Sequence, residues 1–61
     1  MHRYRLIDEA SGADLGPFAS TRLAFQPGET IERGSGELLE LVTVVPPENE
    51  NFRAYLVVRR S

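Results

Sequence analysis

Residues 37–45 read Glu-Leu-Leu-Glu-Leu-Val-Thr-Val-Val, and the conformation of this segment decides the fold class. Its apolar residues fit one face of a helix at four positions: Leu38, Leu41, Val42 and Val45. Three features favour a strand instead: the unbroken run of β-branched residues at 42–45, the short length of the segment, and two apolar residues outside the helical face, Leu39 and Val44. The segment therefore predicts the central strand of a sheet. Apolar residues on both of its faces indicate a strand that bends through a bulge or is covered on both sides.

Closely spaced glycines and prolines divide the rest of the chain into short pieces, which favour strands over helices. Residues 3–8 and 52–59 alternate in the period-2 pattern of half-buried strands. Pro17 lacks an amide hydrogen, so the strand that contains it lies at an edge or is interrupted. We expect no helix longer than about two turns. The predicted strands cover residues 3–8, 14–18, 29–33, 37–45 and 52–59.

The connection between the second and third strands has the least regular pattern. Residues 19–26 predict a loop or an irregular strand, in which Ser20 can cap a single helical turn. Gln26-Pro27-Gly28-Glu29 predicts a type II turn, because proline suits the second position and glycine accepts the positive φ of the third. Gly34-Ser35-Gly36 predicts the chain reversal before the fourth strand.

The expected architecture is all-β, with one small domain over residues 1–61. Five short strands joined by tight turns leave two compact solutions, because a single flat sheet would leave an apolar face in water. The first choice is a small five-stranded, partly open SH3-like barrel, and the alternative is two small packed antiparallel sheets. The predicted core consists of Tyr4, Leu6, Leu15, Phe18, Phe25, Ile31, Leu39, Leu41, Phe52, Ala54, Leu56 and Val58.

The composition narrows the class of protein. Hydrophobic residues make up 41% of the chain and charged residues 26%, proportions that predict a folded globular chain. The lack of cysteine excludes disulfides, thiolate metal sites and thiol catalysis. With no apolar leader behind Met1 and no apolar run of membrane-spanning length, we expect a cytoplasmic protein. The net charge of −2 argues against a general nucleic-acid-binding role but leaves room for a local basic patch.

Four segments carry a resemblance that covers most of the chain: residues 3–8 (RYRLID), 14–18 (DLGPF), 27–31 (PGETI) and 41–46 (LVTVVP). In this order they resemble a set of short uncharacterised bacterial proteins that are common in actinobacteria. The resemblance implies a small bacterial domain, which agrees with the exclusive use of arginine over lysine in this chain. It implies no activity, so no site residue is carried over from it.

No constellation of residues predicts catalysis or the binding of a metal or cofactor. His2 stands beside a chain end that tends to fray and has no partner of fixed geometry. The glycines form no phosphate-binding motif. The carboxylates around the first turn lack the spacing of a calcium loop; they are Asp8, Glu9 and Asp14. We therefore expect no catalytic, metal-binding or cofactor-binding residues, and a protein that is not an enzyme.

Five residues of the first and last predicted strands form the candidate binding site: Arg3, Arg5, Arg53, Tyr55 and Arg59. Closure of a small barrel makes these strands neighbours, so the five side chains can share one outer face. An aromatic ring among guanidinium groups can stack a nucleic-acid base or grip a carboxylate-rich peptide. The alternative is that the arginines pair with Asp8, Glu9 or Glu40 and cover apolar surface with their stems.

The function expected from these observations is that of a small protein-interaction module. Its partner is another protein or a second copy of the chain, and no membrane partner is expected. The alternative is a nucleic-acid-binding barrel that uses the same arginine and tyrosine face. A metal-free enzyme with a pocket between two chains ranks last.

Overall fold

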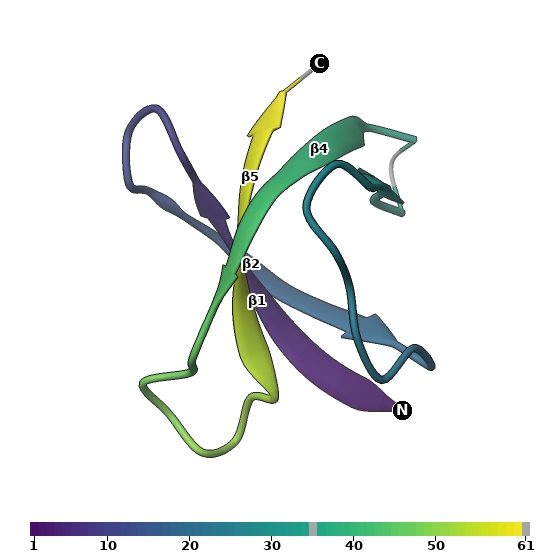
Figure 1. The fold of residues 1–61 in the computed structure, drawn as a ribbon, viewed down its shortest axis with the longest axis vertical. Coiled ribbons are helices and arrows are strands. Elements are labelled where there is room, and N and C mark those ends of the chain that lie inside the picture. The colour runs from purple at the N-terminus through teal and green to yellow at the C-terminus, as the bar shows by residue number, and fades with distance from the viewer. Residues whose placement is uncertain (35, 61) are drawn as a thin grey trace.

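Five strands form one curled sheet in the computed structural model, which describes residues 1–34 and 36–60. The strands are β1 (His2–Asp8), β2 (Asp14–Ser20), β3 (Thr30–Glu32), β4 (Leu38–Val45) and β5 (Ala54–Arg60), and their order across the sheet is β2-β1-β5-β4-β3 (Figure 1). The predicted all-β class and the small, partly open barrel are confirmed. The alternative of two packed antiparallel sheets is wrong, because all five strands belong to the same sheet.

The first and last strands pair in parallel, which makes the sheet mixed. Tyr4 lies opposite Ala54 and Leu6 lies opposite Leu56, while β4 runs antiparallel along the other side of β5. The central strand is therefore β5, and the prediction that residues 37–45 form the centre is wrong. The placement of Pro17 on an edge strand is confirmed, because β2 pairs only with β1 within the described sheet.

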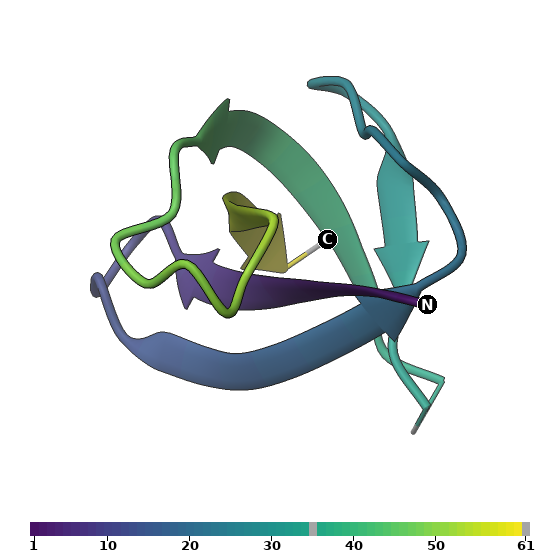
Figure 2. The same ribbon diagram turned by 90° about the horizontal axis from the view of Figure 1, so that it is seen from below.

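A bulge in β4 explains why its sequence resembles that of a central strand. Leu41 lies opposite Val58 but Thr43 lies opposite Val57, so β4 has one more residue than β5 at Val42. An extra residue reverses the alternation of side chains beyond it and bends the strand. Apolar residues consequently occur on both faces of β4, and of the two predicted explanations, a bulge or cover on both sides, the structure shows the bulge. The bend also helps the sheet to curl into a half-barrel (Figure 2).

The core fills the concave face of the half-barrel. Its fully buried side chains are Tyr4, Leu6, Ile31, Leu39, Leu41, Leu56 and Val58. Four partly buried residues pack against them: Leu15, Phe18, Phe25 and Ala54. Eleven of the twelve predicted core residues thus lie in or against the core. Strand alternation places most of them on one face, while Phe25 reaches the core from the loop of residues 21–29. Phe52 is the exception and belongs to the opposite face.

The loop of residues 21–29, here called the crossing loop, connects the two edge strands on the open side of the half-barrel (Figure 2). The predicted turn is present at its end, because the Glu29 amide donates to the Gln26 carbonyl over 3.2 Å and Gly28 has a φ of 94°. Phe25 points its ring edge-on at Tyr4, with 5.1 Å between the ring centroids. The crossing loop therefore supplies part of the core that the open sheet lacks.

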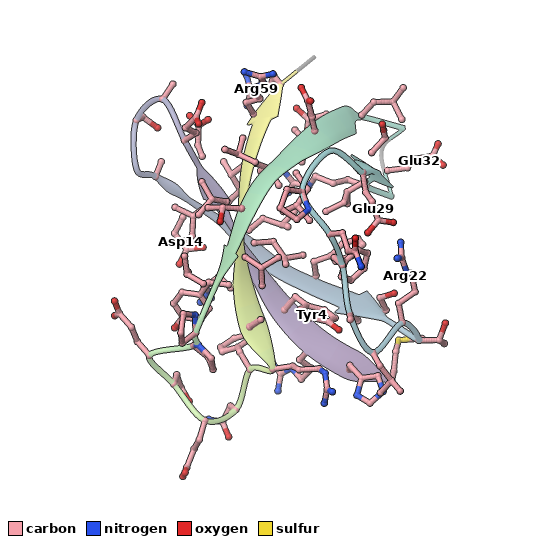
Figure 3. The ribbon with its side chains drawn as sticks, in the orientation of Figure 1. Tyr4, Asp14, Arg22, Glu29, Glu32 and Arg59 are labelled. Carbon is pink, nitrogen blue, oxygen red and sulfur yellow. The ribbon has the colours of Figure 1, made fainter. Side chains whose placement is uncertain are left out.

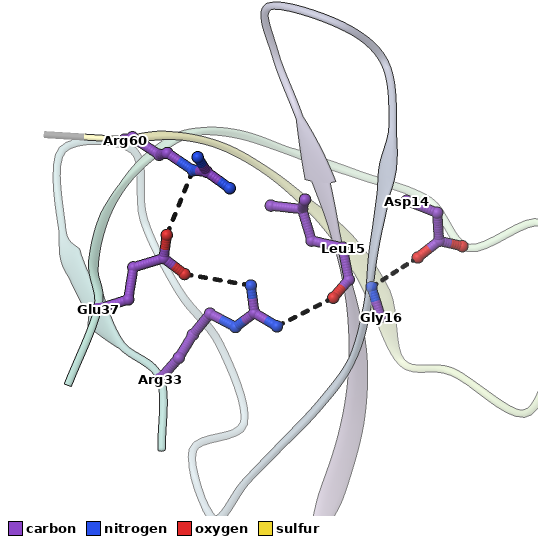
Figure 4. Close-up of polar contacts among 6 residues, drawn as sticks. All are labelled: Asp14, Leu15, Gly16, Arg33, Glu37 and Arg60. Atoms are coloured by element: carbon purple, nitrogen blue, oxygen red, sulfur yellow. Dashed lines mark hydrogen bonds and ion pairs between the residues drawn. The ribbon is translucent and has the colours of Figure 1, made fainter. Parts of the chain in front are cut away.

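A second contact across the open side comes from Arg33, just after β3. Arg33 Nη2 donates to the carbonyl of Leu15 on β2 over 3.1 Å, and Nη1 lies 3.3 Å from Glu37 Oε1 (Figure 4). The chain reverses here as predicted, since the Gly36 amide donates to the Arg33 carbonyl over 2.8 Å. Ser35, the middle residue of the predicted reversal, lies outside the described residues. Arg33 thus ties the two free edges of the sheet together.

Truncation of Leu41 or Leu56 to alanine tests the core. Both side chains are fully buried, so each substitution should lower the free energy of unfolding by about 2–5 kcal/mol. The measurement is urea unfolding followed by circular dichroism. Val44→Ala is the control, because Val44 lies on the same strand as Leu41 and is 37% exposed; it should cost about 1 kcal/mol or less. Equal losses for Val44→Ala and Leu41→Ala would contradict the assignment of the buried face.

The attachment of the crossing loop predicts a dependence of stability on pH. Glu29 Oε1 lies 2.6 Å from Arg22 Nη1, and this contact, aided by the Gln26 amide, lowers the pKa of the Glu29 carboxyl. A lowered pKa stabilises the fold above the carboxyl's ordinary pKa, and the stabilisation disappears as pH falls through the lowered value. Glu29→Gln should therefore be less stable than the parent at neutral pH and equal to it in strong acid, in urea unfolding series at several pH values.

Glu32→Gln is the matched control for this experiment, because Glu32 is exposed and forms no ion pair with a described residue. Its difference from the parent should stay the same across the pH series. If the free energies of unfolding of Glu29→Gln and the parent differ by the same amount from neutral pH to strong acid, the contact with Arg22 does not stabilise the loop.

Candidate functional site

The candidate residues Arg3, Arg5, Tyr55 and Arg59 lie on the convex, outer face of the sheet. They alternate along β1 and β5 with the buried residues of the core, and the register sets Arg5 opposite Tyr55. Arg53 precedes β5, and its amide donates to the Arg3 carbonyl over 2.7 Å. The pairing of β1 with β5 therefore brings residues from the two ends of the sequence together.

Phe52 is the residue of this surface that sequence reasoning missed. Its ring centroid lies 5.3 Å from Arg3 Cζ and 4.8 Å from Arg5 Cζ, within the range of cation–π contacts. Its ring also meets the ring of Tyr55 edge-on, at a centroid distance of 6.0 Å and an interplanar angle of 76°. Arg3, Arg5, Phe52, Arg53 and Tyr55 are here called the basic-aromatic face.

The prediction that Phe52 belongs to the core fails because the last strand starts later than predicted. It begins at Ala54 instead of position 52. The Phe52 amide donates to the carbonyl of Asn49 over 3.0 Å, so Phe52 still belongs to the turn before the strand. The alternation of β5 does not extend to a turn residue. The sequence signal that could have found Phe52 is its position beside Arg53, in a segment expected to neighbour the segment that contains Arg3 and Arg5.

Two of the predicted site arginines are neutralised by carboxylates of the chain. Arg59 Nε lies 2.8 Å from Glu40 Oε1, and this contact raises the pKa of Arg59. Arg59 lies near the C-terminal end of β5 (Figure 3), whereas Phe52 and Arg53 precede the start of that strand. Arg5 Nε lies 3.1 Å from Asp14 Oδ2 in an ion pair, although this buried atom makes no hydrogen bond with a described residue. The pairing of Arg59 with Glu40 is one that the alternative predicted, whereas Arg5 pairs with Asp14, a partner that was not predicted.

Arg3 and Arg53 are the two arginines that form no ion pair with a described residue. Both are exposed. Arg3 contacts the ring of Phe52, and Arg53 Nε donates to the Leu23 carbonyl over 2.7 Å. Their terminal nitrogens form no ion pair with a described residue, so two exposed arginines, joined to each other through the main chain, carry charge that no carboxylate of the described residues neutralises.

The free edge of β2 is poorly suited to pairing with another strand. The Arg3 carbonyl points toward β5, and successive residues of a strand turn their backbone groups to alternate sides. The backbone groups of Tyr4 therefore point toward β2, where they meet those of its partner Phe18. Pro17 and Ala19 therefore turn their backbone groups toward the free edge. Pro17 has no amide hydrogen to donate there, which is a common way to protect an edge strand. The outer face, and not this edge, is the more accessible binding surface.

A shallow depression of about 440 Å³ lies on the crossing loop. Arg22 and Glu29 line it and point toward one another (Figure 3), and the Arg22 guanidinium also lies 4.4 Å from the Phe25 ring centroid. The charged side chains of the depression are thus engaged in holding the loop in place.

The described residues show no arrangement of side chains for metal chemistry. Within residues 1–34 and 36–60, no group of three or more histidine, aspartate or glutamate side chains lies close enough together to hold a metal ion. The Ser11 hydroxyl donates to the Asp8 carboxylate over 2.7 Å and lowers the pKa of that carboxyl. This contact lies within the turn that joins β1 to β2. The same part of the chain contains no helix that could span a membrane.

Comparison of the chain with protein-family models, with curated proteins and with solved structures found no match.

Proposed function

We propose that the chain is a non-enzymatic protein-interaction module that binds an acidic segment of a partner protein on its basic-aromatic face. The observation that carries the proposal is that Arg3 and Arg53, two exposed arginines joined by a main-chain hydrogen bond, form no ion pair with a described residue. Five of the seven arginines form ion pairs within the chain; these are Arg5, Arg22, Arg33, Arg59 and Arg60. The two that form none with a described residue are joined by a main-chain hydrogen bond, although the net charge is −2 and carboxylates outnumber arginines.

The backbone holds these two arginines in a fixed relation. Arg3 lies in β1, which has a strand on each side, and Arg53 is hydrogen-bonded to it through the main chain. The contact with Phe52 further restricts the Arg3 side chain. The binding of a partner therefore costs less side-chain entropy at these residues, which favours affinity.

The chemistry of the face favours carboxylates over nucleic-acid bases. Guanidinium groups form forked hydrogen bonds with carboxylates, and they are desolvated more easily than ammonium groups. Base stacking needs an open aromatic face. The ring of Phe52 is already in contact with Arg3 and Arg5, and its edge-on partner Tyr55 is only partly exposed. The surface thus offers charged donors more readily than a stacking platform.

A binding assay with a matched charge control tests the proposal. The probes are a short fluorescein-labelled peptide rich in glutamate and a single-stranded oligothymidylate of equal charge, measured by fluorescence anisotropy at low salt. The parent should bind the peptide more tightly than the oligonucleotide. Arg3→Gln/Arg53→Gln should lose affinity for the peptide by about tenfold or more, the size expected for residues at the centre of an interface.

Arg59→Gln/Arg60→Gln is the control, since it removes the same charge from the far end of β5, and it should change affinity by less than about twofold. Circular dichroism verifies the fold of both variants. Equal losses in the two variants would mean that only net charge matters and would overturn the assigned face. Tighter binding of the oligonucleotide would support the nucleic-acid-binding alternative, and a parent that binds no peptide would refute the proposal.

A further inference from the structure

We infer that the acidic segment carries an apolar side chain that packs on Leu23, close to the carboxylates that reach Arg53 and Arg3. This inference rests on the proposed function and names the chemistry of the partner more closely. It is based on the contacts that join the crossing loop to the basic-aromatic face.

Leu23 is an exposed apolar residue beside the unpaired cations. Its side chain is 60% exposed, while its carbonyl accepts the hydrogen bond from Arg53 Nε. Phe25, two residues later, turns into the core. The crossing loop thus buries Phe25 and leaves the side chain of Leu23 exposed.

The position of Leu23 is held from both sides. The Arg53 guanidinium bonds its carbonyl, and the hydroxyl of the buried Tyr4 donates to the carbonyl of the preceding Arg22 over 2.7 Å. An apolar side chain on a segment held in this way loses little freedom when a partner covers it. Coverage of a large exposed leucine also removes apolar surface from water.

Two contacts that involve main-chain atoms link Leu23, Arg53 and Arg3 and keep the three residues close together. Leu23 contacts Arg53 through its carbonyl, and Arg53 contacts Arg3 through its amide. An extended peptide advances about 3.3 Å per residue, so one apolar and two acidic side chains within about five residues can reach all three groups. Arg53 uses only Nε for Leu23, which leaves its terminal nitrogens for a carboxylate.

The experiment compares two labelled peptides that differ at one position. One is rich in glutamate with a single leucine, and the other has serine in place of that leucine. The parent should bind the leucine peptide about five- to tenfold more tightly than the serine peptide, the ratio expected for partial burial of a leucine side chain. Leu23→Ser should bind both peptides equally, whereas Leu23→Met should keep most of the preference.

Leu38→Ser is the matched control, because Leu38 is a leucine that is 50% exposed and lies at the start of β4. It should keep the preference for the leucine peptide. A preference that survives in Leu23→Ser, or disappears equally in Leu38→Ser, would overturn the inference. Equal binding of both peptides by the parent would refute the apolar contact and leave the proposed function standing, while a parent that binds neither peptide would refute both.

Discussion

The parallel pairing of β1 with β5 is the constraint on which the rest of the structure depends. It joins segments about fifty residues apart in sequence, a closure that costs conformational entropy before any contact compensates for it. The compensation comes on the concave face, where Leu6 and Leu56 meet in the centre of the core. The same register has a second effect on the convex face, because it sets Arg3 beside Arg53. The core and the candidate binding face are thus two sides of one strand pair.

An open half-barrel of this size needs further contacts where the sheet does not close. The crossing loop places Phe25 against Tyr4, and Arg33 reaches from the end of β3 to the carbonyl of Leu15. These contacts use side chains instead of a continuous ladder, so the seam between β2 and β3 should open more easily than the rest of the sheet. The hydrogen bond from Arg53 to Leu23 connects the basic-aromatic face to this seam. A ligand that competes for the Arg53 guanidinium would therefore act on the loop that closes the barrel.

Local patterns predicted much of the fold, since strand alternation and turn chemistry depend on neighbouring residues. The turn at Pro27-Gly28, the edge position of Pro17 and the bulge in the fourth strand all follow from such rules. The central position of β5 and the role of Phe52 depend on which distant strands pair, and local patterns do not contain that information. The grouping of arginines on one face was expected from barrel closure. Their division into paired and unpaired side chains depends on distances that only the folded chain defines.

Parallel terminal strands also determine how the fold would bear a mechanical load. The start of β1 and the end of β5 lie at opposite ends of the strand pair (Figure 1), so a pull between them acts along both strands. The hydrogen bonds between the two strands are then loaded in shear and must rupture together. An antiparallel hairpin pulled at its open end would instead unzip one bond at a time. The strand pair that organises the core would thus act as the mechanical clamp of the molecule.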